Sequence, residues 1–170
     1  MRANSSDLRE DFFSAMRRLA ASVTILTAGD KNSQAGLTAT AVCSLSADPP
    51  SLIACVNREA RAHDLIASSK RFAVNLLSAD QEDLAMLFAD PQRAKQRFAE
   101  AAWHPDAHGV PLLEGTAANI ICRLDKAVEA FTHTIFIGVV EDIHLNKSSP
   151  LLYGTGSFGR FTSPNQIKDK

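Results

Sequence analysis

Small side chains and hydroxyl groups dominate an apolar stretch at positions 36–57, which a pair of prolines divides into two runs. In the first run, hydroxyl groups occupy alternate positions, at Thr38, Thr40, Ser44 and Ser46. A period of two is typical of a half-buried strand, with one face in the core and the other bearing the hydroxyls. Because such small residues let a flat ligand approach the backbone, this stretch is the first candidate site.

A second candidate site follows at once, where Asn57 and Arg58 open a polar loop that leads into a short predicted helix. Backbone amides at the start of a helix bind anions, and an arginine nearby adds charge-assisted hydrogen bonds. Ala60 and Arg61 lie in the same loop. The loop could therefore hold an anion, although a charged surface turn fits Arg58 or Arg61 individually almost as well.

Two other patterns do not support the sites that they suggest. The glycines of Gly154–Gly159 match G-x-G-x-x-G, but a dinucleotide fold needs a following helix and an acidic residue about 20 positions on. Only 11 residues follow Gly159. His104 and His108 have a spacing that suits two metal ligands on one helix, but Pro105 between them disfavours a helix. We therefore expect neither a Rossmann fold nor a metal site.

Composition narrows the class of protein further. Lys and Arg total 18 against 19 Asp and Glu, without a basic block, so nucleic acid is not an expected partner. No apolar run approaches the roughly 18 to 20 residues of a membrane span, and the first ten residues lack a signal-peptide core. The three cysteines have no zinc or disulfide spacing and fit small core residues in a reducing compartment. These features predict a cytoplasmic protein.

The elements that must position the candidate residues are mostly strands. Periodicity predicts helices near 7–19, after 57 and after 78, and strands at 23–27, 36–46, 51–56, 71–77, 117–129, 134–145 and 151–161. The segment 104–115 is expected to be irregular. Six or seven strands with hairpin connections and three helices predict a mainly β antiparallel barrel with peripheral helices. We expect one domain over residues 1–170, with its core at about 10–161 and a loose tail at 162–170.

The chain resembles the short flavin reductases with an FMN-binding split barrel. The resemblance covers roughly residues 10–161. Its motifs are Phe13 to Met16, Val23 to Thr27, Gly36 to Ser46, Asp48 to Pro50, Cys55 to Arg58, Phe72 to Leu77, Thr132 to Gly138, and Pro150 to Tyr153. In one place the chain departs from the family, which commonly has Gly-Asp-His or Gly-Thr-His where this chain has Phe131, Thr132 and His133.

This resemblance implies a single flavin reductase domain that transfers a hydride from NADH or NADPH to FMN, with FAD as an alternative acceptor. It also implies a homodimer that supplies reduced flavin to a partner monooxygenase. The flavin ring would meet Thr38, Ala39, Thr40 and Ala41. Its ribityl chain or phosphate would reach Ser44 and Ser46, and the phosphate would reach Asn57, Arg58, Ala60 and Arg61. A solvated strand face would give the same serine pattern.

The resemblance places the nicotinamide elsewhere. His133 is the candidate catalytic residue, which would contact nicotinamide or stabilise the reduced flavin. Tyr153, Gly156 and Phe158 would line the nicotinamide side, with a core position as the alternative for Phe158. Two further functions stay open at this point: a non-catalytic flavin carrier, for which Phe131 is the only hint, and a corrin-cobalt reductase with the same barrel.

Overall fold

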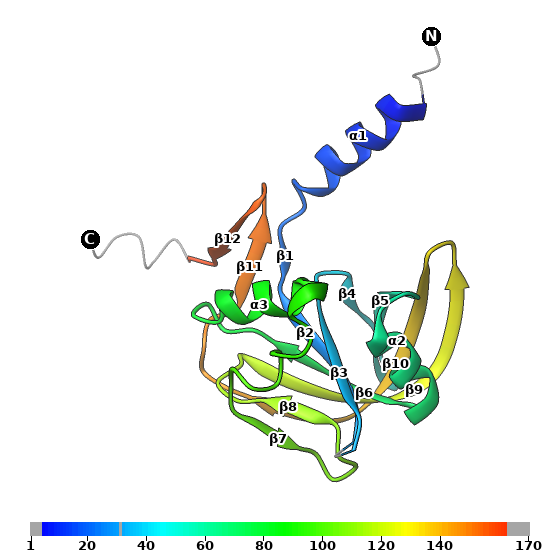
Figure 1. The fold of residues 1–170 in the computed structure, drawn as a ribbon, viewed down its shortest axis with the longest axis vertical. Helices are drawn as coiled ribbons and strands as arrows, with labels where there is room; N and C mark the ends of the chain where they lie inside the picture. The colour runs from blue at the N-terminus through cyan, green and yellow to red at the C-terminus, as the bar shows by residue number, and fades with distance from the viewer. Residues whose placement is uncertain (1–4, 31, 163–170) are drawn as a thin grey trace, which may run out of the picture.

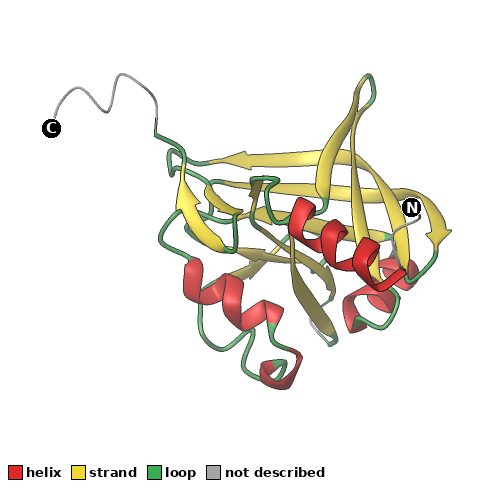
Figure 2. Cartoon of the chain, turned by 90° about the horizontal axis from the view of Figure 1, so that it is seen from above, coloured by secondary structure: helices red, strands yellow, loops and turns green. Residues whose placement is uncertain are grey.

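Seven antiparallel strands form the main sheet of the computed structural model, which describes residues 5–30 and 32–162 (Figure 1). Their spatial order is β3-β2-β6-β9-β10-β5-β4. The strands are β2 (Thr24–Gly29), β3 (Gln34–Ala39), β4 (Val42–Ala47), β5 (Pro50–Asn57), β6 (Arg71–Leu76), β9 (Ala118–Ala130) and β10 (His133–Leu145). The predicted mainly β, antiparallel architecture is thus confirmed, and the strands curve around a common centre (Figure 2).

The sheet is a barrel that does not close. β3 and β4 are consecutive in the chain, yet they lie at opposite edges of the sheet and do not pair with each other. Thr40 and Ala41 carry the chain across this open seam, and the Ala41 carbonyl accepts a hydrogen bond of 3.0 Å from the Cys55 amide. The prediction of one continuous strand over 36–46 is therefore wrong, because the second half pairs with β5 instead.

Buried strands hold the barrel together. Every residue of β2 is buried. The core also contains fully buried side chains, at Leu26, Phe72, Cys122 and Phe136. Burying an aromatic or aliphatic side chain of this kind stabilises the fold by about 1.5–3 kcal/mol. Burial also raises the pKa of the Cys122 thiol to about 12, which keeps it protonated. Cys122 is thus a core residue as predicted, whereas Cys43 is exposed.

Two helices cover the barrel and border the candidate sites. Helix α2 (Arg61–Ser69) buries Ala62 and Ile66, and helix α3 (Glu82–Ala89) buries Leu87 and Phe88. A 3-10 turn, η1 (Pro91–Arg93), follows α3. Just before α3, the Gln81 side chain accepts a hydrogen bond of 3.0 Å from the Ser78 amide. The helix itself begins later than predicted, at Glu82.

Helix α1 (Ser5–Met16) extends away from the barrel (Figure 1). Its predicted apolar stripe is exposed rather than buried, with Leu8 at 66% and Phe12 at 56% of full exposure. Just after the helix, the Arg17 carbonyl accepts a hydrogen bond from the Thr155 amide. The helix is present as predicted, but its apolar side chains remain largely exposed.

Two small sheets complete the fold. β1 (Ala21–Ser22), β11 (Leu151–Gly154) and β12 (Ser157–Arg160) form one, in the order β1-β11-β12, and β7 (Trp103–Pro105) pairs with β8 (Pro111–Leu113) in the other. The segment 104–115, predicted to be irregular, is thus largely a hairpin. The final predicted strand is likewise a hairpin of two. Nearly all of the expected loose tail, residues 163–170, lies outside the described residues.

Candidate functional site

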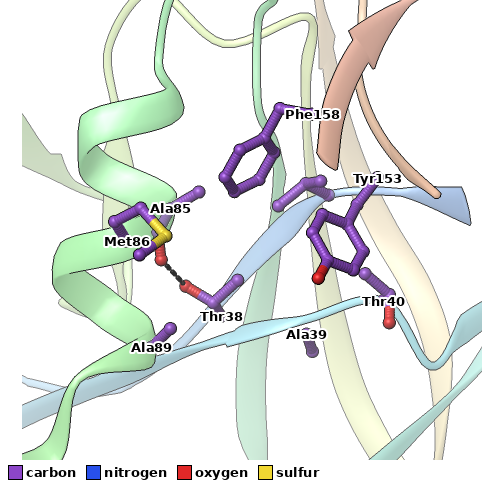
Figure 3. Close-up of a pocket in the computed structure, with 9 residues that line it drawn as sticks. Thr38, Ala39, Thr40, Ala85, Met86, Ala89, Tyr153 and Phe158 are labelled. Carbon is purple, nitrogen blue, oxygen red and sulfur yellow. Dashed lines mark hydrogen bonds between the residues drawn. The ribbon is translucent and has the colours of Figure 1, made fainter. Parts of the chain in front are cut away.

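A hollow of about 260 Å³ lies between β3, helix α3 and the β11–β12 hairpin (Figure 3). We call it the aromatic hollow. It is lined by Val23, Thr38, Ala39, Thr40, Ala85, Met86, Ala89, Tyr153 and Phe158. The rings of Tyr153 and Phe158 meet edge to face, with centroids 5.3 Å apart. The structure thus gathers five of the predicted site residues around one mainly apolar space.

The floor of the aromatic hollow is the edge strand β3. The Thr38 hydroxyl donates a hydrogen bond of 2.6 Å to the Ala85 carbonyl of helix α3 (Figure 3). This hydroxyl therefore does not donate its proton to a ligand. The Ala39 carbonyl accepts a similar bond of 2.7 Å from the Thr24 hydroxyl. Because β3 pairs only with β2, alternate backbone groups along its free edge remain unpaired within the sheet. Those backbone groups could meet the polar edge of a flat ligand.

A second hollow of about 490 Å³ adjoins the first, and both share Thr38 and Ala89. We call it the arginine hollow. It is lined by Gly36, Leu37, Thr38, Asn57, Glu59, Ala60, Arg61, Ala62, Phe88, Ala89, Pro91, Ala94 and Arg97. Two guanidinium groups, Arg61 and Arg97, face this space, and Glu59 is the one carboxylate among its described lining residues. The charge balance favours an anion.

The loop before α2 shapes one wall of the arginine hollow. The Asn57 side chain accepts a hydrogen bond of 3.0 Å from the Glu59 amide, and the Asn57 carbonyl accepts one of 3.0 Å from the Ala60 amide. Ala60 is the N-cap of α2 and has no side chain that could accept from the first turn. The first amides of a helix have no partner within the helix. The His63 amide already donates a bond of 2.8 Å to the Ala60 carbonyl, so the amides of Arg61 and Ala62 are the ones that a ligand at the mouth of α2 could use.

The two loop arginines have different surroundings. Arg61 lines the arginine hollow and donates a hydrogen bond of 3.2 Å to the Ser33 hydroxyl. Arg58 and Thr132 line another hollow, which shares Asn57 and Glu59 with the arginine hollow, and Arg58 forms an exposed ion pair of 3.2 Å with Glu129. Arg58 is therefore partly neutralised on the surface. Its predicted role at a phosphate stays a prediction, as does that of Arg61.

Like Arg58, three predicted site residues at or beyond the break in the strand lie apart from both hollows, namely Ala41, Ser44 and Ser46. Ser44 and Ser46 line a third, largely apolar hollow of about 320 Å³ on the β4–β5 side of the barrel. The Ser46 hydroxyl also donates to the Asp48 carbonyl and accepts from the Asp48 amide, so it stabilises a turn. Ala41 lies on the seam crossing. The expected shared hydroxyl face ends at Thr40, because the strand breaks there.

His133 begins strand β10, directly opposite Asn57 of β5. Its side chain is exposed, and its Nδ1 lies 2.9 Å from the Thr132 hydroxyl. His133 is not among the described residues that line the aromatic or arginine hollow. Phe131 beside it is 96% exposed and has a left-handed backbone, with φ of 55°. A single copy thus leaves the predicted catalytic residue outside the two adjoining hollows.

Gly156 lies at the turn between β11 and β12, where its φ is 83°. Glycine adopts this left-handed conformation without steric cost. It is not among the lining residues of the aromatic hollow, unlike Tyr153 and Phe158. Gly156 thus shapes the hairpin that carries both aromatic rings. Its predicted place on the nicotinamide side is not tested.

The paired hollows suit a flavin in shape and chemistry. A flavin has a flat, largely apolar ring at one end and a phosphate at the other. The aromatic hollow offers Tyr153, Phe158 and the free edge of β3, while the arginine hollow offers Arg61, Arg97 and the α2 amides.

No group of three potential metal ligands occurs among the described residues. None of the described helices has the length and apolar character needed to span a membrane.

Sequence reasoning missed Arg97. The residue lies in a polar segment between the helix predicted after 78 and the segment 104–115, and no motif marks it. Its guanidinium donates hydrogen bonds to the carbonyl of Asp90, seven positions earlier, and to that of Gly36, 61 positions away in the sequence. Only the fold brings these groups together.

Comparisons with known proteins agree with this architecture. The model of the flavin reductase like domain family matches residues 16–162. The chain is 39% identical to the FMN reductase (NADH) RutF of Stutzerimonas stutzeri over 145 residues, which covers 85% of this chain and 83% of that protein. It is 34% identical over 161 residues to the 4-hydroxyphenylacetate 3-monooxygenase reductase component of Pseudomonas aeruginosa, covering 93% and 95%.

Among solved structures, the NADH:FAD oxidoreductase SgcE6 of Streptomyces globisporus, in complex with NAD and FAD fragments, matches with a TM-score of 0.87. The two sequences are 29% identical, and the match covers 96% of this chain and 98% of that chain. A similar fold thus occurs in a protein whose solved structure is a complex with NAD and FAD fragments.

Proposed function

Because the chain belongs to the flavin reductase-like family, we propose that it is an NAD(P)H:flavin oxidoreductase. It transfers a hydride from NADH or NADPH to FMN, with FAD as an alternative acceptor. The observation that carries this proposal is the adjacency of the aromatic and arginine hollows across Thr38 and Ala89. Residues 1–170 would act as a single flavin reductase domain.

The flavin supplies the redox chemistry when it is bound, so the protein must hold and orient it. Thr38, Ala39 and Thr40 would border the ring, and the backbone along β3 would meet its polar edge. The α2 amides and Arg61 would hold the phosphate. Tyr153 and Phe158 would exclude water from the ring, which strengthens electrostatic interactions inside the site.

A homodimer belongs to the proposal. The exposed apolar stripe of α1 and the exposed ring of Phe131 are surfaces that a second copy would cover. His133 lies next to Phe131, outside the hollows of its own chain. A second copy could therefore complete the nicotinamide site around His133. Reduced flavin would then pass to a partner monooxygenase, since the Pseudomonas aeruginosa relative is named as a monooxygenase reductase component. We propose the cytoplasm as the location.

The proposal is tested with purified protein. A visible spectrum records bound flavin, and the absorbance of NADH or NADPH is followed with FMN, with FAD and without added flavin. We expect oxidation of the nicotinamide that depends on flavin. Flavin binding without nicotinamide oxidation would instead identify a carrier, and absence of flavin binding would contradict both functions. Oxidation with a corrin acceptor alone would favour the corrin-cobalt reductase.

Replacing His133 by Ala tests the catalytic role within this function. We expect flavin reduction to slow by no more than about 100-fold, the lower range for losing one transition-state donor. Hydride transfer needs no general acid, so activity should persist. His144→Ala is a matched control, because His144 is also an exposed histidine of β10 and lies 3.2 Å from Asp142. A wild-type rate in His133→Ala would remove His133 from the site.

A further inference from the structure

Arg97 joins strand β3 to helix α3 at the arginine hollow. Its guanidinium donates hydrogen bonds of 2.7 Å to the Gly36 carbonyl of β3 and 2.9 Å to the Asp90 carbonyl at the end of α3. The guanidinium carbon also lies 5.6 Å from the ring centroid of Phe88. These contacts fix the orientation of the planar group, so a ligand would meet a pre-organised cation.

Arg97 forms no direct ion pair with a carboxylate in the described part of the chain. The charge of Asp90 acts on it from a greater distance and opposes the effect of burial on its pKa. Burial lowers the pKa of Arg97 below its ordinary value, while the guanidinium stays charged. Its Nε is buried and finds no acceptor among the described residues. A partly desolvated cation of this kind is stabilised by an anion.

The position of Arg97 along β3 matches one end of a flavin. Arg97 is bound at Gly36, whereas the aromatic hollow is lined by Thr38 and Ala39 of β3 and by Thr40 directly after it. Thr40 follows Gly36 by four positions, which is about 13 Å of extended backbone. A ring placed in the aromatic hollow would thus direct its phosphate toward Arg97.

We propose that Arg97 binds the flavin phosphate, as a second cation beside Arg61. This inference rests on the proposed function and adds a binding residue to it. The alternative is that Arg97 only ties β3 to the end of α3. The two roles differ in what they predict for a flavin without a phosphate, because a purely structural residue would affect every flavin equally.

The test is a flavin titration of the full-length protein, followed by fluorescence, with FMN, FAD and riboflavin. For Arg97→Met we expect about tenfold weaker binding of FMN and FAD, which is about 1.4 kcal/mol, and riboflavin binding within twofold of wild type. Arg97→Lys, which keeps the charge, should restore most of the preference for FMN over riboflavin. If Arg97→Met does not fold, Arg97→Gln serves as the neutral variant against Arg97→Lys.

Two outcomes would overturn the proposal. One is an equal loss of FMN and riboflavin, which would make Arg97 a structural tie. The other is unchanged flavin binding with a raised KM for the nicotinamide coenzyme. Arg61→Met separates this inference from the proposed function. If Arg61→Met lowers the FMN preference and Arg97→Met does not, the phosphate site stands without Arg97. If wild type binds FMN no better than riboflavin, the proposed phosphate site itself fails.

Discussion

At the scale of single residues, Thr38 is predicted to contact a ligand, and in the structure its hydroxyl binds the protein itself. Its position beside the flat-ligand site follows from the sequence, because the small-residue pattern is visible there. The target of its hydroxyl does not, since the Ala85 carbonyl is 47 residues away. The bond joins the floor of the aromatic hollow to its α3 wall. Thr38 therefore positions the site through α3 as well as bordering it.

We expect Thr38→Val to lower the free energy of unfolding by about 1 kcal/mol, the usual net contribution of one hydrogen bond. For a domain of this size that corresponds to about 2–4 °C in Tm. Thr40→Val is the control, because Thr40 borders the same hollow but is exposed. Denaturant unfolding measures both variants. Equal unfolding free energies for the two would show that the bond to Ala85 contributes nothing.

At the scale of elements, the sequence predicts most strands because hairpin partners lie close together in the chain. β2 with β3 and β9 with β10 follow from period-two patterns and the turns between them. The pairing of β7 with β8 has no such signal in the segment 104–115. That hairpin is held by Asn75 of β6, which accepts a bond of 2.9 Å from the Leu113 amide. A buried polar group from a distant strand thus gives the segment its structure.

The site likewise contains some features that the sequence predicts and others that it does not. The floor strand and the loop before α2 are predictable, because small residues and helix-start signals mark them. The final segment is predicted as one strand, so its turn between β11 and β12 is not foreseen. Arg97 and the break at Thr40 and Ala41 are not predictable, because they depend on which strand edges the folded barrel leaves open. Periodicity describes the faces of a strand and contains no information about a barrel seam.

Helix α1 carries a prediction of its own. A helix of 12 residues is marginal in water without packing, yet α1 exposes Leu8, Phe12 and Met16 on one side. We expect Phe12→Glu to weaken self-association and to leave the thermal unfolding of the barrel unchanged at low protein concentration. Sedimentation equilibrium over a range of concentrations measures this. Glu10→Gln, on the opposite side of α1, is the control. If the Phe12→Glu protein dimerises with the same dissociation constant as wild type, this stripe is not an interface.

At the scale of the whole molecule, the chain separates a continuous core from a site built at the edge of the sheet. The core fills the barrel around Phe72 and Phe136, while both adjoining hollows border β3, the edge strand at the seam. An edge strand has free backbone groups that a ligand can use, and a central strand does not. The unclosed barrel thus provides stability and a binding edge in one domain.

Two glycines test whether the core and the site respond separately, because neighbouring atoms lie too close to either one to leave room for a side chain. A Cβ on Gly36 would lie 2.8 Å from Phe88 Cε1 and 3.0 Å from the Leu26 carbonyl oxygen, at the site. A Cβ on Gly138 would lie 2.6 Å from Phe72 Cζ, inside the barrel. We expect either Ala variant to lose about 1–3 kcal/mol of stability through overpacking.

The two variants should differ in flavin binding. Gly36→Ala pushes on Phe88, whose ring supports Arg97 and lines the arginine hollow, so FMN affinity should fall even where the protein is fully folded. Gly138→Ala displaces Phe72, which borders neither adjoining hollow, so FMN affinity should stay within about twofold of wild type, less than 0.5 kcal/mol. FMN titrations below the unfolding transition of both variants make the comparison. A matching loss in Gly138→Ala would mean that the core and the seam respond as one unit, so that any strain inside the barrel reaches the flavin.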